Sequence, residues 1–324
     1  MQKHRWRRHA AVSTAAVMTT ASLAAVLVGC SAQSGDSTWT TQPAASSLTR
    51  LPGTLPAGKA SPPTKVLTFV FENHSLGQMQ DGMPYLDNLA HQYAYATDFT
   101  AITHPSLPNY LAIAGGSTFG VTDDALPEAN ASRVGNAESV FDQAIARGHT
   151  AKTYAESMPE NCAVTSSDPY ATKHNPWAYF LAHQGDCATY DVPSGTPDSG
   201  ALAADIADGS LPNVGLVIPN LCNDAHDCSL SSADTWLSGW LSKVLTSPDF
   251  TSGRLVVVVT ADEDDHHSDN KILTVVVHAG SPPGQVVTTP LTLYSLSRLY
   301  SELIGASPLG EAAASPDMKA AFRL

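Results

Sequence analysis

The sequence predicts an α/β domain built on a doubly wound, mainly parallel sheet with helices on both faces. First, several short segments are nearly continuous apolar runs, which is the pattern of strands covered on both faces. Second, these runs alternate with segments in which apolar residues recur at helical spacing. Third, 43% of the 324 residues are hydrophobic and 15% are charged, which supplies a sizeable core, while 22 Gly and 22 Pro indicate many loops.

The predicted elements follow one another from residue 65. Lys65–Phe71 is a β-branched and aromatic run that follows two prolines, as expected of a buried strand. The other predicted strands are Ala151–Ala155, Val214–Ile218, Leu255–Val259 and Ile272–Val277. The predicted helices are Pro84–Tyr93, Ala137–Arg147, Trp236–Leu245 and Tyr294–Ile304. Ligands bind beyond the carboxyl ends of the strands in such sheets, so the polar residues after each strand are candidates for chemistry.

The N-terminal segment has the pattern of an export signal. Residues 1–29 have a basic start, an apolar stretch and small residues before Cys30. The end of this segment resembles a bacterial lipobox, so we expect a lipoprotein-type signal and a lipid on Cys30. An ordinary secretory signal with a chance cysteine is the alternative. Residues 30–63 are rich in Ser, Thr and Pro and are expected to be a disordered tether, which leaves 64–324 as the folded domain.

The charge balance argues against nucleic-acid partners. The chain has 17 Lys and Arg against 30 Asp and Glu, a net charge of −13. Removal of the four basic residues of the leader leaves 13 positive against 30 negative side chains, or −17. Such a surface repels nucleic-acid phosphates and anionic lipid headgroups. We therefore expect no nucleic-acid binding, and membrane contact only through the Cys30 lipid.

Four further cysteines lie in the folded domain. They are Cys162, Cys187, Cys222 and Cys228. In an exported protein an even set of cysteines indicates disulfides. Three pairings are possible, and proximity in sequence favours Cys162 with Cys187 and Cys222 with Cys228. Zinc-thiolate ligation is the rival interpretation, but the chain has no C-x-x-C pair to support it.

Polar residues after three of the predicted strands indicate a metal site. They are Glu72 and Asn73, then Asp224, His226 and Asp227, and finally Asp262 and Glu263. A doubly wound sheet brings such loops together, and adjacent carboxylates need either solvent or a cation. Carboxylate, amide and imidazole ligands suit divalent zinc, manganese, magnesium or calcium. Taken singly, these residues could also be a solvated acidic turn or helix caps.

The segment Thr103–Tyr110 contains a candidate nucleophile, Ser106, framed by prolines and followed by an apolar run. A Ser hydroxyl is a weak nucleophile until a base or a metal activates it. The sequence lacks the G-x-S-x-G elbow of the α/β-hydrolases. A serine that leads into a helix lies near free backbone N–H groups, which favour an anionic substrate. A serine that only caps a helix is the alternative interpretation.

Several segments, in the same order, resemble the bacterial phosphoesterase family of the alkaline phosphatase superfamily. They are FVFENHS, THPSLPNYLAIAGG, KHNPW, IPNLCNDAHDCS and TADEDD, and together they span about residues 65 to 305. They are most similar to secreted acid phosphatases that act on phosphatidylinositol 3-phosphate. The resemblance implies an alkaline-phosphatase-like fold, with 64–324 as the catalytic domain.

The resemblance also implies roles for individual residues. It implies a metal held by Glu72, Asn73, Asp262 and Glu263, with Ser106 as the nucleophile that becomes phosphorylated. Asn109 belongs to the same motif and is counted with the catalytic residues. Asp224, His226 and Asp227 match a segment that holds a second metal or the phosphate. His174 resembles a residue on the phosphate side, although a capping or core histidine is nearly as good an interpretation.

One position departs from the family pattern. Relatives have a histidine in a His-Tyr-Ser segment before the last helix, whereas this chain has Leu293. Either His278, His266 or His267 substitutes for that histidine, or the protein works more slowly or with one metal. The x-Pro-x-Arg pattern of sulfatases is not matched, because Tyr110 stands at the arginine position.

These observations together predict an extracytoplasmic phosphomonoesterase, lipid-anchored or secreted, that depends on a divalent metal and acts on phosphate monoesters. The resemblance adds phosphoinositides as candidate substrates. The first alternative is a phospholipase C or phosphodiesterase that uses the same site. The second is a lipoprotein that binds a metal or another ligand without catalysis. The Ser106 segment favours an enzyme, because a binding protein needs no nucleophile.

Overall fold

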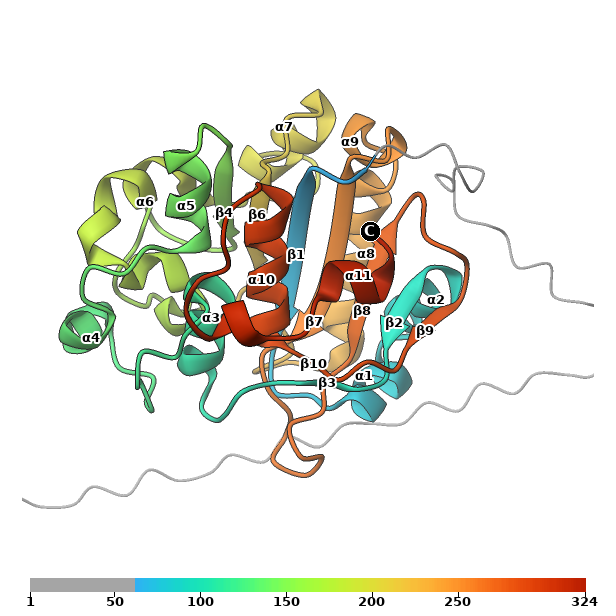
Figure 1. Cartoon of the computed structure of the whole chain (residues 1–324), viewed down its shortest axis with the longest axis horizontal. Helices are drawn as coiled ribbons and strands as arrows, with labels where there is room; N and C mark the ends of the chain where they lie inside the picture. The colour runs from blue at the N-terminus through green and yellow to red at the C-terminus, as the bar shows by residue number, and fades with distance from the viewer. Residues whose placement is uncertain (1–61) are drawn as a thin grey trace, which may run out of the picture. The chain divides into compact units, whose positions relative to one another are not determined.

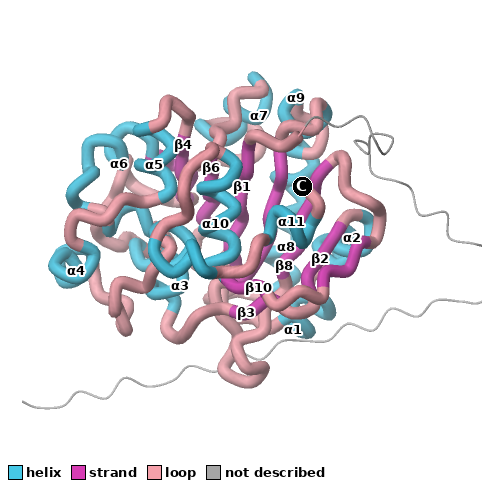
Figure 2. The backbone as a smooth tube through the Cα atoms, viewed as in Figure 1, coloured by secondary structure: helices cyan, strands magenta, loops and turns pink. Residues whose placement is uncertain are grey.

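The computed structural model describes residues 62–324, so the predicted leader, Cys30 and nearly all of the predicted tether lie outside the described residues. Within 62–324 the chain forms an α/β fold in which helices cover both faces of an eight-stranded sheet (Figures 1 and 2). The predicted fold class is therefore confirmed.

The large sheet is parallel except for one strand. Its strand order is β5-β4-β6-β1-β7-β8-β2-β9, and β8 alone runs antiparallel to its neighbours. The strands are β1 Lys65–Phe71, β2 Ala94–Ala96, β4 Ala151–Ala155, β5 Asp191–Pro193, β6 Val214–Ile218, β7 Leu255–Ala261, β8 Thr274–His278 and β9 Gln285–Val287. A separate parallel pair joins β3 Phe99–Thr100 to β10 Leu291–Thr292.

The central strands β1 and β7 determine where the next residues lie. They pair in parallel from Lys65 with Leu255 to Phe71 with Ala261, so they end at the same level. All seven residues of β7 are buried, in agreement with its unbroken apolar sequence. The residues that follow the two strands therefore emerge side by side.

The helices form two layers. Helices α3, α5 and α10 contact one another, and Figure 1 shows α10 in front of β1. Helix α8 lies behind the strands and packs against α1, α2 and α7. The α-helices are α1 Leu76–Gly82, α2 Pro84–Gln92, α3 Ser106–Gly115, α4 Pro127–Val134, α5 Val140–Ala146, α6 Gln184–Tyr190, α7 Ala201–Asp208, α8 Leu230–Val244, α9 Pro248–Thr251, α10 Leu293–Leu303 and α11 Met318–Phe322. Short 3₁₀ helices cover η1 Thr172–His174, η2 Pro176–Tyr179, η3 Leu181–His183 and η4 Gly310–Ala314.

All the predicted strands and helices are present, with differences at their ends. Helix α8 begins at Leu230, six residues before the predicted start, because Ser229 caps it by accepting a hydrogen bond from Ser232 N at 3.3 Å. Strand β8 begins only at Thr274, because Ile272 N donates to Phe99 O and so joins β3 and not the large sheet. The three-residue strands β2, β5 and β9 were not predicted.

Both predicted disulfides are present. Cys162 pairs with Cys187, and Cys222 pairs with Cys228. No helix among residues 62–324 is both long and apolar enough to cross a bilayer.

Candidate active site

Three neighbouring strands end at one edge of the sheet and bring acidic residues together there. Strands β6, β1 and β7 are adjacent and parallel. Glu72 follows β1, Asp262 follows β7, and Asp224 lies in the turn after β6. The backbone joins them, because Glu72 N donates to Asp224 O at 2.8 Å and Asp262 N donates to Phe71 O at 2.9 Å. All three carboxyl side chains are buried.

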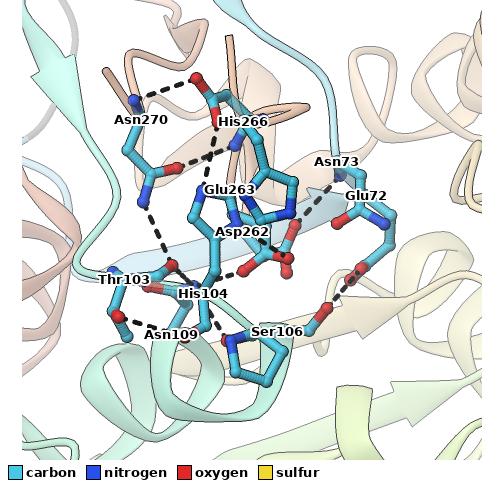
Figure 3. A network of polar contacts seen from close by, with 12 residues as sticks. Glu72, Asn73, Thr103, His104, Ser106, Asn109, Asp262, Glu263, His266 and Asn270 are labelled. Atoms are coloured by element: carbon cyan, nitrogen blue, oxygen red, sulfur yellow. Dashed lines mark hydrogen bonds and ion pairs between the residues drawn. The ribbon is translucent and has the colours of Figure 1, made fainter. Parts of the chain in front are cut away.

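Ser106 is the first residue of α3, and its side chain points at Glu72 (Figure 3). Its Oγ donates a hydrogen bond to Glu72 Oε2 at 3.0 Å, and the residue is 1% exposed. The preceding Pro105 follows a cis peptide bond and has no side chain that could cap the helix. The candidate nucleophile therefore stands at a helix N-terminus in direct contact with the acidic cluster.

Asn109 fixes the segment that precedes this serine. Its Oδ1 accepts hydrogen bonds from Ile102 N and Thr103 N, at 2.9 and 3.1 Å. Its Nδ2 donates to Thr103 O at 2.7 Å and to Glu263 Oε2 at 3.0 Å (Figure 3). Both ends of the amide are occupied, so the structure gives Asn109 a positioning role, holding the segment before Ser106 and the Glu263 carboxyl.

Asn73, after β1, and Asp262, after β7, are joined by a hydrogen bond. Asn73 has a φ of 51°, a conformation that asparagine adopts more readily than most residues, and its N–H donates to Asp262 Oδ1 at 3.3 Å. Asn73 Oδ1 and Asp262 Oδ2 are both buried without a hydrogen-bond partner. Buried polar atoms without partners are costly, so these two oxygens call for a donor or a cation.

His174 links the end of β1 to the loop after β6. Its Nε2 lies 3.2 Å from Glu72 Oε2, and its Nδ1 lies 3.2 Å from Asp224 Oδ2. One atom from each of these three residues lies within 4.8 Å of the others, which is a geometry that can hold a metal ion. The predicted histidine is therefore a member of the cluster, and it is also buried.

The acidic cluster shifts the pKa of its members. Burial, together with the charges of Glu72 and Glu263, raises the pKa of Asp262 well above its ordinary value. Burial and the charge of Glu72 raise the pKa of Glu263 to about 8. Burial alone would lower the pKa of His174, but Glu72 and Asp224 outweigh it and raise that pKa to about 9. The site is therefore short of positive charge.

The donor set fits a divalent cation. Carboxylate and amide oxygens with one imidazole are the ligands of zinc, manganese, magnesium and calcium sites. Glu72, His174 and Asp224 place ligand atoms close together, and Asn73 and Asp262 each have a buried oxygen without a hydrogen-bond partner. A cation would also stabilise the buried carboxylates, which repel one another.

Two predicted residues lie at the margin of the cluster. His226 is partly exposed, and its ring centroid lies 5.9 Å from that of His174. Its Nδ1 lies 2.7 Å from Asp227 Oδ1, and the Asp227 side chain is 55% exposed. Asp227 therefore faces solvent and partners His226, whereas the neighbouring Asp224 is buried in the cluster.

Two residues to which the sequence analysis gave no role in the site contact the cluster. Tyr110 donates a short hydrogen bond to Glu72 Oε1, and its ring stacks on that of His174 with centroids 5.2 Å apart. His104 Nδ1 lies 3.2 Å from Glu263 Oε1, and its Nε2 lies 3.2 Å from Asp264 Oδ1. The available signal for Tyr110 was its spacing, since it follows Ser106 by four residues on the same helix.

The three histidines proposed to replace the family histidine at Leu293 differ in position. His266 stacks on His104 with ring centroids 3.8 Å apart, next to Glu263 (Figure 3). His278 ends the antiparallel β8 opposite Val256, at the start of β7, and so lies at the other end of the sheet. His278 is therefore not a substitute. Leu293 itself is buried as the first residue of α10, and His267 is exposed.

Comparison with solved structures concerns the fold alone. A protein of the alkaline phosphatase superfamily from Vibrio parahaemolyticus superposes with a TM-score of 0.53 at 11% identity, covering 83% of this chain and 71% of that one. A putative sulfatase from Bacteroides fragilis gives 0.52 at 13% identity, covering 83% and 80%. The predicted alkaline-phosphatase-like fold is thereby confirmed.

Comparison of sequences identifies the family. The chain is 34% identical over 196 residues to the phosphatidylinositol-3-phosphatase of Mycobacterium tuberculosis, covering 59% of this chain and 61% of that protein. It is 30% identical over 225 residues to the phosphate-repressible acid phosphatase of Penicillium chrysogenum, covering 67% and 53%. The chain thus spans between half and two thirds of the length of these relatives. The model of the phosphoesterase family matches residues 73–302, well over half of the chain, and the protein belongs to that family.

Proposed function

We propose that this protein is a metal-dependent phosphomonoesterase that forms a phosphoserine at Ser106. The observation that carries the proposal is the contact between Ser106 Oγ and Glu72 Oε2, 3.0 Å apart, within a cluster of buried carboxylates that calls for a cation. The names of the acid phosphatases and of the phosphatidylinositol-3-phosphatase among its relatives support the same reaction class.

In the proposed reaction the residues of the chain bind, orient and shield the phosphate. Ser106 Oγ loses its proton and attacks phosphorus, a new Oγ–P bond forms, and the bond to the leaving group breaks as that oxygen takes up a proton to depart as the alcohol. Water then cleaves the phosphoserine and releases inorganic phosphate. Glu72 accepts the Ser106 hydrogen bond and holds the hydroxyl in place, while the N-terminus of α3 favours the negative charge of the phosphate.

Glu72, Asn73, Asp262 and Glu263 would hold the cation, which supplies positive charge against the phosphoryl oxygens and lowers the pKa of the serine hydroxyl. Asp224 and His174 lie close enough to Glu72 to belong to the same centre or to a second one. Zinc, manganese, magnesium and calcium are the candidate metals.

The proposed location is the outer face of the cell membrane or the medium. The two disulfides support an oxidising compartment. This proposal includes the predicted signal at 1–29, the lipid on Cys30, the tether at 30–63 and a catalytic domain at 64–324. Phosphoinositides are the proposed lipid substrates, by similarity to the Mycobacterium tuberculosis relative.

A comparison of two chromogenic substrates tests the function. The purified domain is assayed on p-nitrophenyl phosphate and on bis(p-nitrophenyl) phosphate, with and without a chelator. We expect monoester turnover that prolonged chelation abolishes and that returns with one of the four metals. Preferential cleavage of the diester would favour the phosphodiesterase alternative, and no turnover of either substrate would favour the binding protein.

Two serine variants test the nucleophile. Ser106→Ala should abolish monoester turnover, because no other group takes over attack on phosphorus. Ser297→Ala is the matched control, since Ser297 is a buried serine of α10 whose Oγ has no hydrogen-bond partner. Mass spectrometry of the quenched enzyme should find phosphate on Ser106 in the wild type. Full activity in Ser106→Ala would refute the proposed nucleophile.

A further inference from the structure

Lys173 stands beside the site and has no part in the reaction described so far. It belongs to η1 and directly precedes His174. A lysine ammonium is charged at neutral pH. The next residue, His174, contacts Glu72 and Asp224, so Lys173 stands beside the acidic cluster.

Asp124 holds this ammonium near the nucleophile. Lys173 Nζ lies 3.2 Å from Asp124 Oδ2, and Asp124 Oδ1 accepts a hydrogen bond from Leu107 N at 3.0 Å. Leu107 follows Ser106 in the first turn of α3. The same carboxylate thus ties the lysine to the helix end that carries the serine. The two side chains are 22% and 30% exposed, so a solute can reach them.

The ammonium has donors to spare. A lysine ammonium carries three N–H donors. Within the described part of the chain Lys173 Nζ makes one hydrogen bond, to Asp124 Oδ2. Two donors therefore remain for an anion. Asp124 therefore orients the ammonium and uses only one of its three hydrogen-bond donors.

A phosphate substrate at this acidic cluster needs a positively charged side chain close by. Among residues 62–324 no lysine or arginine forms an ion pair with Glu72, Asp224, Asp262 or Glu263. The ion pairs of Glu72, Asp224 and Glu263 are with histidines. A phosphate monoester carries close to two negative charges at neutral pH, whereas a diester carries one. The second charge of the monoester is repelled by these carboxylates unless a cation faces it.

We propose that Lys173 binds a phosphoryl oxygen of the substrate and selects the dianionic monoester over the monoanionic diester, an inference that rests on the proposed phosphomonoesterase function. Lys173 thus contributes to substrate binding and specificity, and Asp124 holds its ammonium in position.

Phosphate binding and kinetics test this role separately. Isothermal titration calorimetry measures the Kd of inorganic phosphate, in buffer with a divalent cation, for the wild type, Lys173→Gln and Lys173→Arg. The loss of one charged hydrogen bond should raise the Kd about 10-fold to 100-fold in Lys173→Gln. Lys173→Arg should restore much of the affinity. Lys243→Gln is the matched control, because Lys243 forms a comparable ion pair with Asp198, at 3.1 Å, in an exposed position.

The kinetic arm measures selectivity. In Lys173→Gln the value of kcat/KM should fall more for p-nitrophenyl phosphate than for bis(p-nitrophenyl) phosphate, mainly because KM rises. The melting temperature of the variant shows whether it is folded. Unchanged phosphate affinity in folded Lys173→Gln, or no phosphate binding by the wild type, overturns the role of Lys173. Phosphate binding that depends on Lys173 without monoester turnover overturns the proposed function and leaves the anion-binding role standing.

Discussion

The two halves of the candidate site are held in place by different means. The strand half consists of Glu72, Asn73 and Asp262, which follow β1 and β7 directly. These strands lie in the middle of the sheet and pair along their whole length. The loop half consists of His174 and Asp224, which lie in segments without strand structure. The Cys162–Cys187 bridge encloses His174, and the Cys222–Cys228 bridge encloses Asp224.

This difference indicates how the fold secures each half. Paired backbone and buried apolar side chains fix the ends of central strands, so the strand half needs no further support. The loop half lacks strand pairing, and a covalent bridge reduces the conformations that such a segment can adopt. Glu72 joins the halves, since it contacts Ser106 on one side and His174 on the other.

Among the residues that join or support the two halves, the largest effect is expected at Glu72, where the halves meet. Glu72→Gln removes the charge that holds His174 and that faces the cation, while it keeps the size of the side chain. We expect kcat/KM for p-nitrophenyl phosphate to fall about 10²-fold to 10³-fold, the usual loss for one electrostatic stabiliser. Glu128→Gln, on the exposed surface of α4, is the control. A loss of less than tenfold would mean that the halves do not act through Glu72.

Tyr110 should give the next largest effect, because it orients Glu72 without being a metal ligand. Tyr110→Phe removes the hydroxyl that donates to Glu72 Oε1 and keeps the ring that stacks on His174. Loss of such a partner typically lowers metal affinity or activity about 10-fold to 100-fold. Metal titration and steady-state kinetics measure both quantities, with Tyr190→Phe at the exposed end of α6 as the control. Unchanged values in both assays would contradict the orienting role.

The sequence was sufficient to predict the strand half. An unbroken apolar run such as VVVV, followed by acidic residues, indicates both a buried strand and the point where it ends. Parallel strands then bring Glu72 and Asp262 to one edge, and the structure has them there. The proline-framed serine leads into α3, as expected.

The sequence could not predict side-chain directions or contacts between distant segments. The bond from Tyr110 to Glu72 spans 38 residues and depends on how α3 packs on the sheet. Nothing in the local sequence distinguishes buried Asp224 from exposed Asp227. The position of His278 follows from the antiparallel direction of β8, which a run of valines does not reveal. Three-residue edge strands such as β2 are too short to show a period.

The disulfides should affect stability differently, and activity only through the loop half. In the chain-entropy estimate, loss of the bridge with a sequence separation of 25 costs about 3.5 kcal/mol, and loss of the bridge with a separation of 6 costs about 2 kcal/mol. Paired Cys→Ser variants measured by urea unfolding test this order. Activity should fall about tenfold or less in each, because the strand half is untouched. A loss as large as that in Glu72→Gln would show that the bridges also hold the strand half.

At Asp191, which contacts the residue after His174, we expect an effect on stability and not on activity. Asn175 Nδ2 donates to Asp191 Oδ2 at 2.7 Å, and Asn175 follows His174. Burial raises the pKa of Asp191 from 3.8 to about 7, against the opposing hydrogen bonds from Thr153 and Asn175. Between pH 4 and pH 7 the folded state therefore keeps a proton that the unfolded state has lost, and the free energy of unfolding falls as pH rises through this window.

Asp191→Asn removes that proton exchange, so its free energy of unfolding should decline less between pH 4 and pH 7, by at most about 4 kcal/mol. Urea unfolding across this range measures the decline in the variant, the wild type and the exposed control Asp208→Asn. The buried carboxyl groups of Asp262 and Glu263 also have raised pKa values, so they too make the free energy of unfolding fall as pH rises. The difference between the variant and the wild type therefore isolates the contribution of Asp191. Equal declines in Asp191→Asn and the wild type would mean that Asp191 is already ionised in the folded protein. The loop half would then rest on a charged carboxylate, and its stability would be insensitive to pH at this position.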